Sequence, residues 1–236
     1  MNSVVGHADE EFVIAKLNSA TARSIEANET PALPFAAQSI TKRVFDFSFA
    51  FFILILLLPV LLMIAIAIKL DSRGPVFFKQ TRWGFGQRPI QVLKFRSMAT
   101  DKCDATGIAQ TVVGDARITR IGAFLRKSSL DELPQFINVL RGDMSVVGPR
   151  CHAIGMLAAG LPYEELVPNY HDRHNVRPGI TGLAQIRGWR GPTTDPVHAR
   201  ARVLCDLYYI QNYNLWLDFR IILATIKNEM TGGTGL

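Results

Sequence analysis

An uncharged, apolar segment, residues 47–68, constrains the fold of this chain more than any other feature. It is 22 residues long, and as an α-helix it would measure ~33 Å at ~1.5 Å per residue, about the thickness of a bilayer's hydrocarbon core. Its length therefore predicts a membrane helix. Pro59 lies near its middle, where a proline removes the hydrogen bond to the carbonyl group of Ile55 and kinks or breaks a helix.

Two interpretations of this segment stay open on the residues alone. Lys42 and Arg43 precede the segment, and Lys69 and Arg73 follow it. Because basic flanks favour the cytoplasm and both flanks are basic, charge does not indicate which end of the segment faces the cytoplasm. The segment is either a simple transmembrane helix or a kinked, re-entrant element that returns to the face it entered. The second arrangement would keep both basic ends in the cytoplasm.

The positive charge of the chain is concentrated directly after this segment. The net charge is +6, and residues 69–150 alone carry 14 basic and 7 acidic side chains. A basic surface next to a bilayer attracts anionic lipid headgroups or phosphorylated substrates. We do not expect nucleic acid as a partner, because the chain contains no recognisable nucleic-acid-binding motif.

Cysteine usage indicates a reducing compartment. The three cysteines, Cys103, Cys151 and Cys205, are odd in number, far apart and without metal-binding spacing. We expect no signal peptide, because the apolar segment starts only after 46 residues. Together these features predict a cytoplasmic domain held at a membrane.

The whole chain predicts an α+β fold that is mostly helical. We expect a polar tail over residues 1–39, the membrane element over 40–70 and a cytoplasmic domain over 71–236. Alternating residues around a Gly-rich turn predict a β-hairpin over 75–98. Apolar periodicity predicts helices, some of them amphipathic and interfacial, and Pro and Gly content predicts loops. The helices are expected over 118–126, 131–140, 163–174 with an interruption at Pro168, 197–213 and 216–230, and the loops over 99–116 and 177–182.

Asp131 and Glu132 are the main candidates for chemistry, and they also have a structural explanation. Ser129 and Glu132 have the spacing of a capping box, and acidic residues favour the first turn of a helix. Pro134 argues against Ser129 as the cap, because it would then lie in the fifth helical position and remove a backbone hydrogen bond. A helix that starts one or two residues later places Pro134 in its first turn. The local pattern alone favours the structural interpretation.

The cations of the basic region shift that balance towards a binding site. Five of them lie beside predicted turns or loops: Lys94, Arg96, Arg126, Arg150 and Arg177. Arginine binds phosphate oxygens in a bidentate manner, and Mg²⁺ needs only one or two carboxylates plus substrate phosphate. A carboxylate can also attack phosphorus. These residue types together predict a pyrophosphate site.

Six segments, in order along the chain, resemble the bacterial sugar transferase family, the monotopic polyprenyl-phosphate hexose-1-phosphate transferases. The resemblance covers about residues 40–230. The segments are KRxxD at 42–46, LKFRSM at 93–98, LRKSSLDELPQ at 125–135, GDMSVVGPR at 142–150, VRPGITG at 176–182 and DLYY at 206–209.

The resemblance implies a topology and a chemistry. The membrane helix would be re-entrant, broken at Leu58 and Pro59, and residues 71–236 would form a catalytic domain on the cytoplasmic face of a bacterial inner membrane. Asp131 would attack the β-phosphate of a UDP-hexose and release UMP, and polyprenyl (undecaprenyl) phosphate would then accept the sugar phosphate. Glu132 would bind Mg²⁺ or Mn²⁺. The residues that hold phosphate or nucleotide would be Lys94, Arg96, Arg126, Arg150 and Arg177.

The resemblance also implies a product and shows two departures. The product would start an exopolysaccharide or related surface glycan, and residues 176–226 are more similar to the branch that transfers glucose or galactose phosphate. Cys151 replaces the proline that usually follows Gly-Pro-Arg, which puts the aim of Arg150 in doubt, because a proline restricts the residue before it. Only a tail precedes residue 40, as in a short form of the family.

A second function from a different class shares most of these features. A membrane-surface protein could use the basic region to hold anionic lipid or a glycan-assembly partner without turnover. The two functions differ in whether Asp131 reacts. The sequence leaves the oligomeric state open, a homodimer included.

Overall fold

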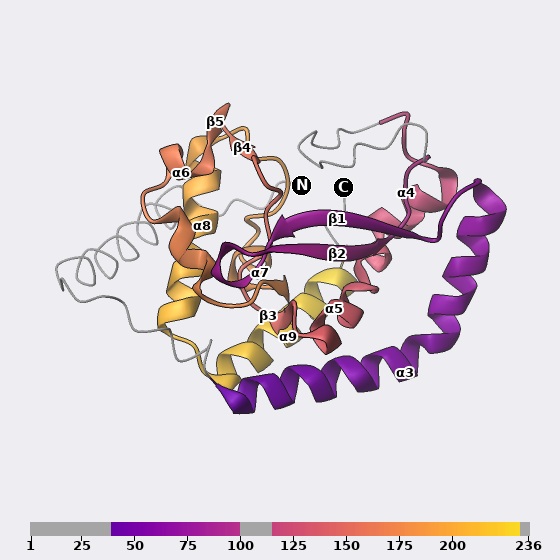
Figure 1. Ribbon diagram of the computed structural model, residues 1–236, viewed down its shortest axis with the longest axis horizontal. Coiled ribbons are helices and arrows are strands. Elements are labelled where there is room, and N and C mark those ends of the chain that lie inside the picture. Colours follow the sequence, from indigo (N-terminus) through magenta and orange to yellow (C-terminus); the bar gives the residue numbers. More distant parts are fainter. Residues whose placement is uncertain (1–38, 100–114, 232–236) are drawn as a thin grey trace.

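The computed structural model describes residues 39–99 and 115–231 (Figure 1). The tail predicted over 1–39 and the loop predicted over 99–116 lie almost entirely outside these ranges. The elements in chain order are α3 (Ile40–Asp71), β1 (Phe77–Trp83), η1 (Phe85–Gln87), β2 (Pro89–Phe95), α4 (Arg120–Lys127), η3 (Leu130–Glu132), α5 (Gln135–Arg141), β3 (Ser145–Val147), β4 (Leu157–Ala158), β5 (Leu161–Pro162), α6 (Tyr163–Leu166), η4 (Tyr170–Asn175), β6 (Gly179–Thr181), α7 (Leu183–Ile186), α8 (Pro196–Gln211) and α9 (Leu215–Met230), where η denotes a 3₁₀ turn. The predicted class, α+β and mostly helical, is confirmed.

The apolar segment forms most of α3, a single helix of 32 residues. Ser39 caps its first turn by accepting a hydrogen bond from the backbone N–H of Lys42 at 3.2 Å. Within the described ranges, α3 is the one helix long and apolar enough to cross a membrane, and little of its apolar stretch is buried inside the protein. These properties agree with a membrane element at this place in the chain.

The break predicted at Leu58 and Pro59 takes a different form. The helix is continuous from Ile40 to Asp71 with Pro59 inside it, so the helical hydrogen-bond pattern does not stop at this proline. Figure 1 shows instead that α3 is bent, with one limb along the bottom of the view and a second limb that turns upward at the right. An internal proline is a common cause of a sharp kink, because it removes one hydrogen bond without ending the helix.

Buried charges hold the first limb of α3 on the rest of the protein. The Nζ of Lys42 lies 2.7 Å from Oδ2 of Asp218 on α9 and 3.7 Å from Oδ1 of Asp46. Asp46 also accepts hydrogen bonds from the hydroxyl of Ser145 and from the backbone N–H of Val146 on β3. One turn of α3 is thus linked to a helix and a strand far along the chain.

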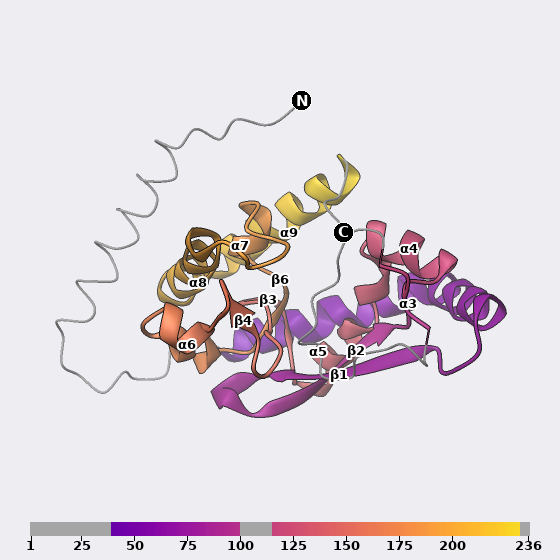
Figure 2. The same ribbon diagram turned by 90° about the horizontal axis from the view of Figure 1, so that it is seen from above.

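The second limb of α3 packs through apolar side chains. Ile64 and Ile68 form a buried cluster with Phe95 of β2 and Leu125 of α4. Figure 2 shows α4 beside this limb and the β1–β2 hairpin running from it across the molecule. The hairpin is antiparallel, with Phe77 opposite Phe95, as predicted. The remaining core gathers around α5, α8 and the short pair β3–β6.

Most predicted helices are confirmed, and one predicted loop is wrong. Helices form near 118–126, 197–213 and 216–230, and the 163–174 segment divides at Pro168 into α6 and η4. The loop predicted over 177–182 contains β6, which pairs in parallel with β3. Its partner lies more than 30 residues away, so no local pattern could reveal this pairing.

Removing Lys42 tests the buried charge cluster. Lys42→Met should lower the free energy of unfolding by about 3–5 kcal/mol, because it leaves the carboxylates of Asp218 and Asp46 buried without their cation. Denaturant titration of the detergent-solubilised protein measures this change. Lys69→Met, at the exposed end of α3, should cost less than about 0.5 kcal/mol. Equal losses in the two variants would contradict the role given to Lys42.

Candidate active site

The two carboxylates lie on a short turn between two helices. Helix α4 ends at Lys127, and Ser129 adopts left-handed backbone angles, φ 54° and ψ 13°, before the 3₁₀ turn η3. Ser129 makes no capping hydrogen bond to η3, and Pro134 stands at the N-cap of α5. The capping-box interpretation is therefore wrong. Asp131 and Glu132 belong to a turn of their own, and α5 begins at Gln135, later than predicted.

A cavity of about 440 Å³ opens above this turn. Asp131 and Glu132 both line it, together with residues of β1, β2, α5, α7 and α9. Asp131 is buried, with 7% of its surface exposed. Two apolar lining residues, Phe95 and Leu133, also pack in the cluster that contains Ile64 and Ile68 of α3. The cavity thus lies directly beside the second limb of the membrane-capable helix.

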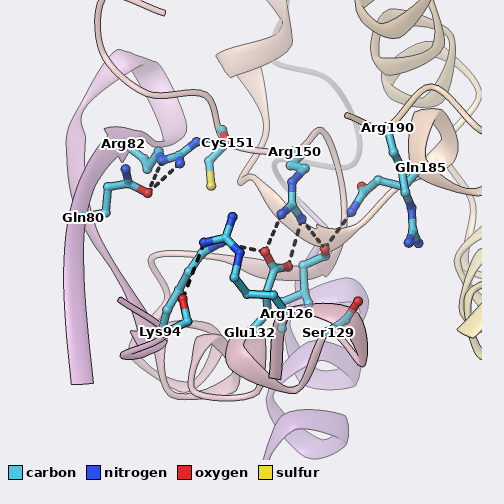
Figure 3. A network of polar contacts seen from close by, with 12 residues as sticks. Gln80, Arg82, Lys94, Arg126, Ser129, Glu132, Arg150, Cys151, Gln185 and Arg190 are labelled. Carbon is cyan, nitrogen blue, oxygen red and sulfur yellow. Dashed lines mark hydrogen bonds and ion pairs between the residues drawn. The ribbon is translucent and has the colours of Figure 1, made fainter. Parts of the chain in front are cut away.

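Two cations bind Glu132. The Nζ of Lys94 lies 2.7 Å from its Oε1, and the guanidinium of Arg150 donates to both carboxylate oxygens, at 3.0 Å to Oε2 (Figure 3). Burial by itself would raise the pKa of Glu132, but Arg150 and Lys94 outweigh burial through their charges and hydrogen bonds and hold that pKa well below its usual value. The charge of Glu132 in turn raises the pKa of Arg150. Glu132 is therefore a fixed anion.

Asp131 has the opposite electrostatic character. Burial raises its pKa above the usual value, the charge of Lys94 opposes this shift and the neighbouring charge of Glu132 adds to it. A desolvated carboxylate is a stronger nucleophile than a hydrated one, because fewer hydrogen bonds must be broken before it attacks. The pair thus divides into a reactive carboxylate and a charge-neutralised one.

Backbone contacts from several elements hold Arg150 in place. Arg150 forms a parallel bridge with Gly179, and the N–H of Gly179 donates to the carbonyl of Pro149 at 2.9 Å. A Cβ on Gly179 would lie 2.1 Å from the nitrogen of Gly148, so only glycine permits this approach. Arg173, paired with Asp206 of α8, donates to the carbonyl of Arg150 at 2.6 Å. These contacts aim Arg150 at Glu132 although Cys151 replaces a proline.

The structure brings four of the five predicted cations to the cavity, and two of these four, Lys94 and Arg150, bind Glu132. Lys94, Arg126 and Arg150 line the cavity with Asp131 and Glu132. Arg96 also lines it, but its guanidinium donates to the carbonyls of Ser72 and Arg73 just after α3, at 2.7 and 2.5 Å. Arg177 does not line this cavity. Its Nε donates to the carbonyl of Gly142 at 2.9 Å and its guanidinium lies over the ring of Phe85.

Several cavity residues escape sequence reasoning. They are Arg82, Gln185, Arg190, Arg202 and Glu229. The sequence could have indicated Arg82, because alternation along β1 puts it on the same face as Gln80. The Nε–H of Arg82 donates to Oε1 of Gln80 at 2.9 Å. The others come from separate loops and helices, and only tertiary packing brings them to the cavity.

The donor set fits a Mg²⁺-type ion completed by substrate. Within the described ranges, no group of three or more His, Cys, Asp or Glu side chains could hold a metal ion. Mg²⁺ needs fewer protein ligands, since one or two carboxylates and phosphate oxygens suffice. Asp131 and Glu132 supply hard oxygen donors on the cavity wall. Glu132 would exchange a contact to Lys94 or Arg150 for the metal.

Comparison with known proteins finds relatives that are named as enzymes of sugar-phosphate transfer or as exopolysaccharide production proteins. The exopolysaccharide production protein PSS of Rhizobium leguminosarum bv. phaseoli is 60% identical over 83% of this chain and 98% of its own length. The undecaprenyl-phosphate glucose phosphotransferase of Komagataeibacter xylinus is 50% identical over 81% of this chain and 36% of its own length. The UDP-glucose:undecaprenyl-phosphate glucose-1-phosphate transferase of Caulobacter vibrioides is 47% identical over 84% of this chain and 73% of its own length.

The match to a family model covers both the membrane helix and the cavity. The model described as bacterial sugar transferase matches residues 37–232, which include α3, the carboxylate turn and every element that lines the cavity. With Asp131 and Glu132 inside the matched region, the chain belongs to the bacterial sugar transferase family.

Proposed function

We propose that this protein transfers glucose 1-phosphate from UDP-glucose to undecaprenyl phosphate and releases UMP, as the first membrane step of exopolysaccharide synthesis. The observation that carries the proposal is a buried, cation-surrounded Asp131 in a cavity beside a membrane-capable helix. Relatives named for glucose transfer and for exopolysaccharide production favour glucose over other hexoses. The rival, a lipid-binding protein without turnover, requires no desolvated carboxylate.

The first step forms a covalent intermediate on Asp131. A carboxylate oxygen attacks the β-phosphorus of UDP-glucose, and the bond from that phosphorus to the bridging oxygen breaks. UMP leaves with the bridging oxygen, and glucose phosphate remains on Asp131 as an acyl phosphate. Lys94, Arg126 and Arg150 line the cavity, where they would face the charge that gathers on the phosphate oxygens, and such preorganised cations stabilise a transition state of this kind.

The second step transfers the phosphosugar to the lipid. A phosphate oxygen of undecaprenyl phosphate attacks the phosphorus of the intermediate, and the bond to Asp131 breaks to restore the carboxylate. The product is undecaprenyl diphosphate glucose. The apolar residues Phe95 and Leu133 lie between the cavity and α3, on the side from which a lipid would approach.

A divalent cation is part of the proposal. Glu132 would hold Mg²⁺ or Mn²⁺ together with the substrate's phosphates, and the ion would supply charge neutralisation to the leaving UMP. Glu132 is suited to this role because its low pKa keeps it ionised throughout the physiological range.

We also propose that α3 is re-entrant and that the domain lies on the cytoplasmic face of the inner membrane. In Figure 1 the bend of α3 places the rest of the domain in the angle between its two limbs, an arrangement that a re-entrant helix would require. Lys42 and Lys69 lie at opposite ends of the helix, and crossing would place one of these basic ends outside. The exposed apolar residues of α9, among them Trp216 and Phe219, suit an interfacial position.

Asp131→Asn tests the covalent step. UMP release from UDP-glucose should fall at least about 10³-fold, because the amide cannot form the acyl phosphate. Mass spectrometry of the wild-type protein without lipid acceptor should find glucose phosphate on the peptide that contains Asp131. Asp172→Asn, an exposed carboxylate, should retain the wild-type rate. Folded wild-type protein that releases no more UMP than Asp131→Asn would favour the binding protein.

The pH dependence of UMP release tests the environment of Asp131. The nucleophile must be ionised, so activity is present above its pKa and is lost as the pH falls through that pKa. Burial raises this pKa and Lys94 opposes the shift, so Lys94→Met should move the acid limb of the kcat profile to higher pH. Lys79→Met removes an exposed cation from β1 and should leave the limb in place. If the acid limb of the kcat profile lies at the same pH in Lys94→Met as in the wild type, Asp131 is not the group that must be ionised.

Cysteine labelling tests the topology of α3. In a background with Cys103, Cys151 and Cys205 replaced by serine, Ile40→Cys and Pro75→Cys mark the two exposed ends of the membrane element. A membrane-impermeant maleimide should label neither in intact cells and both after permeabilisation. Labelling of one end in intact cells would mean that α3 crosses the bilayer.

A further inference from the structure

Glu229 of α9 links two separate walls of the cavity through one carboxylate. The hydroxyl of Ser129 donates to its Oε2 at 3.1 Å, and Nη1 of Arg190 donates to its Oε1 at 2.7 Å. All three residues line the cavity, and Glu229 is 100 residues from Ser129 in the chain. Each carboxylate oxygen therefore accepts a hydrogen bond from a different element.

Ser129 is the residue whose backbone turns the chain towards Asp131. Its left-handed conformation is uncommon for a residue with a Cβ, and such backbone strain persists only where surrounding contacts compensate it. Its hydroxyl makes no cap to the following turn and is used on Glu229 instead. Since Asp131 is only two residues further along, the direction of its side chain depends on this conformation.

Arg190 lies on the loop between α7 and α8, on the opposite wall (Figure 3). Positive φ angles at Gly188 and Gly191 turn this loop on either side of Arg190. Arg202 of α8 holds the loop from behind by donating to the carbonyls of Trp189 and Gly191, each at 2.9 Å. On the side of the loop that faces the Asp131–Glu132 turn, Glu229 holds Arg190 through its carboxylate.

We propose that Glu229 is a positioning residue for the transfer reaction. It fixes the turn that aims Asp131 into the cavity and keeps the Arg190 loop at a constant distance from that turn. This inference rests on the proposed function, and it adds a residue that does not touch the reacting atoms. Glu229 acts through Ser129 and Arg190, both of which already occupy its carboxylate.

Kinetics of three variants test the proposal. Glu229→Ala should lower kcat for UMP release roughly 10- to 100-fold with a much smaller change in KM for UDP-glucose, because misplacement of the nucleophile affects the chemical step. Glu229→Gln keeps an oxygen acceptor for Ser129 and should recover part of kcat. Ser129→Ala combined with Glu229→Ala should be no slower than Glu229→Ala alone, since both changes remove one shared interaction.

Hydrogen exchange adds a readout that does not depend on activity. In Glu229→Ala, backbone amides of the peptide over residues 126–133 should exchange faster than in the wild type. Lys227→Ala removes an exposed side chain from the same helix and should change neither exchange nor kcat.

Three results would overturn the positioning role. These are a wild-type kcat in Glu229→Ala, a double variant slower than Glu229→Ala, and a loss of kcat that only follows a loss of folded protein in a thermal melt. A wild-type protein that releases no UMP would instead reject the proposed function. In that case unchanged exchange over 126–133 would reject the structural link as well.

Discussion

The ion pair between Lys42 and Asp218 determines how the membrane-capable helix meets the rest of the protein. Both side chains are buried, and Asp218 also accepts a hydrogen bond from the hydroxyl of Tyr209 at 2.7 Å. A charged pair in such a place gains its attraction only if its geometry is kept, because the cost of desolvation is large. The first limb of α3 therefore has one angle and one depth relative to α9 and β3. The position of the cavity relative to the membrane-capable helix follows from that angle.

The charge states of the two carboxylates in the cavity depend on a second balance, between burial and neighbouring charge. Asp131 and Glu132 are adjacent in the chain, yet Lys94 and Arg150 bind only Glu132 directly. The charge of Glu132 is thereby neutralised, whereas burial leaves Asp131 with a raised pKa. Phosphoryl transfer by a covalent route needs this separation, since one anion must react while the surrounding charge still attracts an anionic substrate.

The sequence predicts what depends on neighbours in the chain and fails where distant contacts decide. Alternation and turn residues were enough for the β1–β2 hairpin, and apolar periodicity was enough for α8 and α9. The 3₁₀ turn of Asp131 was missed because its form depends on Ser129, whose left-handed backbone is supported by Glu229. Arg177 was grouped with the site cations because it lies beside a predicted loop and within a family segment, but it does not line the cavity, and its Nε donates to the carbonyl of Gly142. Sequence spacing identified Arg150, but not the Arg173 contact that fixes its backbone.

One short piece of β2 has a consequence for how this protein can vary. Lys94 points to Glu132, and two residues later Arg96 binds the carbonyls after the second limb of α3. The same strand thus carries the charge of the cavity and the attachment of the membrane element. A one-residue insertion between Trp83 and Lys94 can be absorbed only in the η1 turn, because a shift of strand register would turn both cations to the opposite face. Length variation among related chains is therefore expected at the tip of the hairpin and not along its strands.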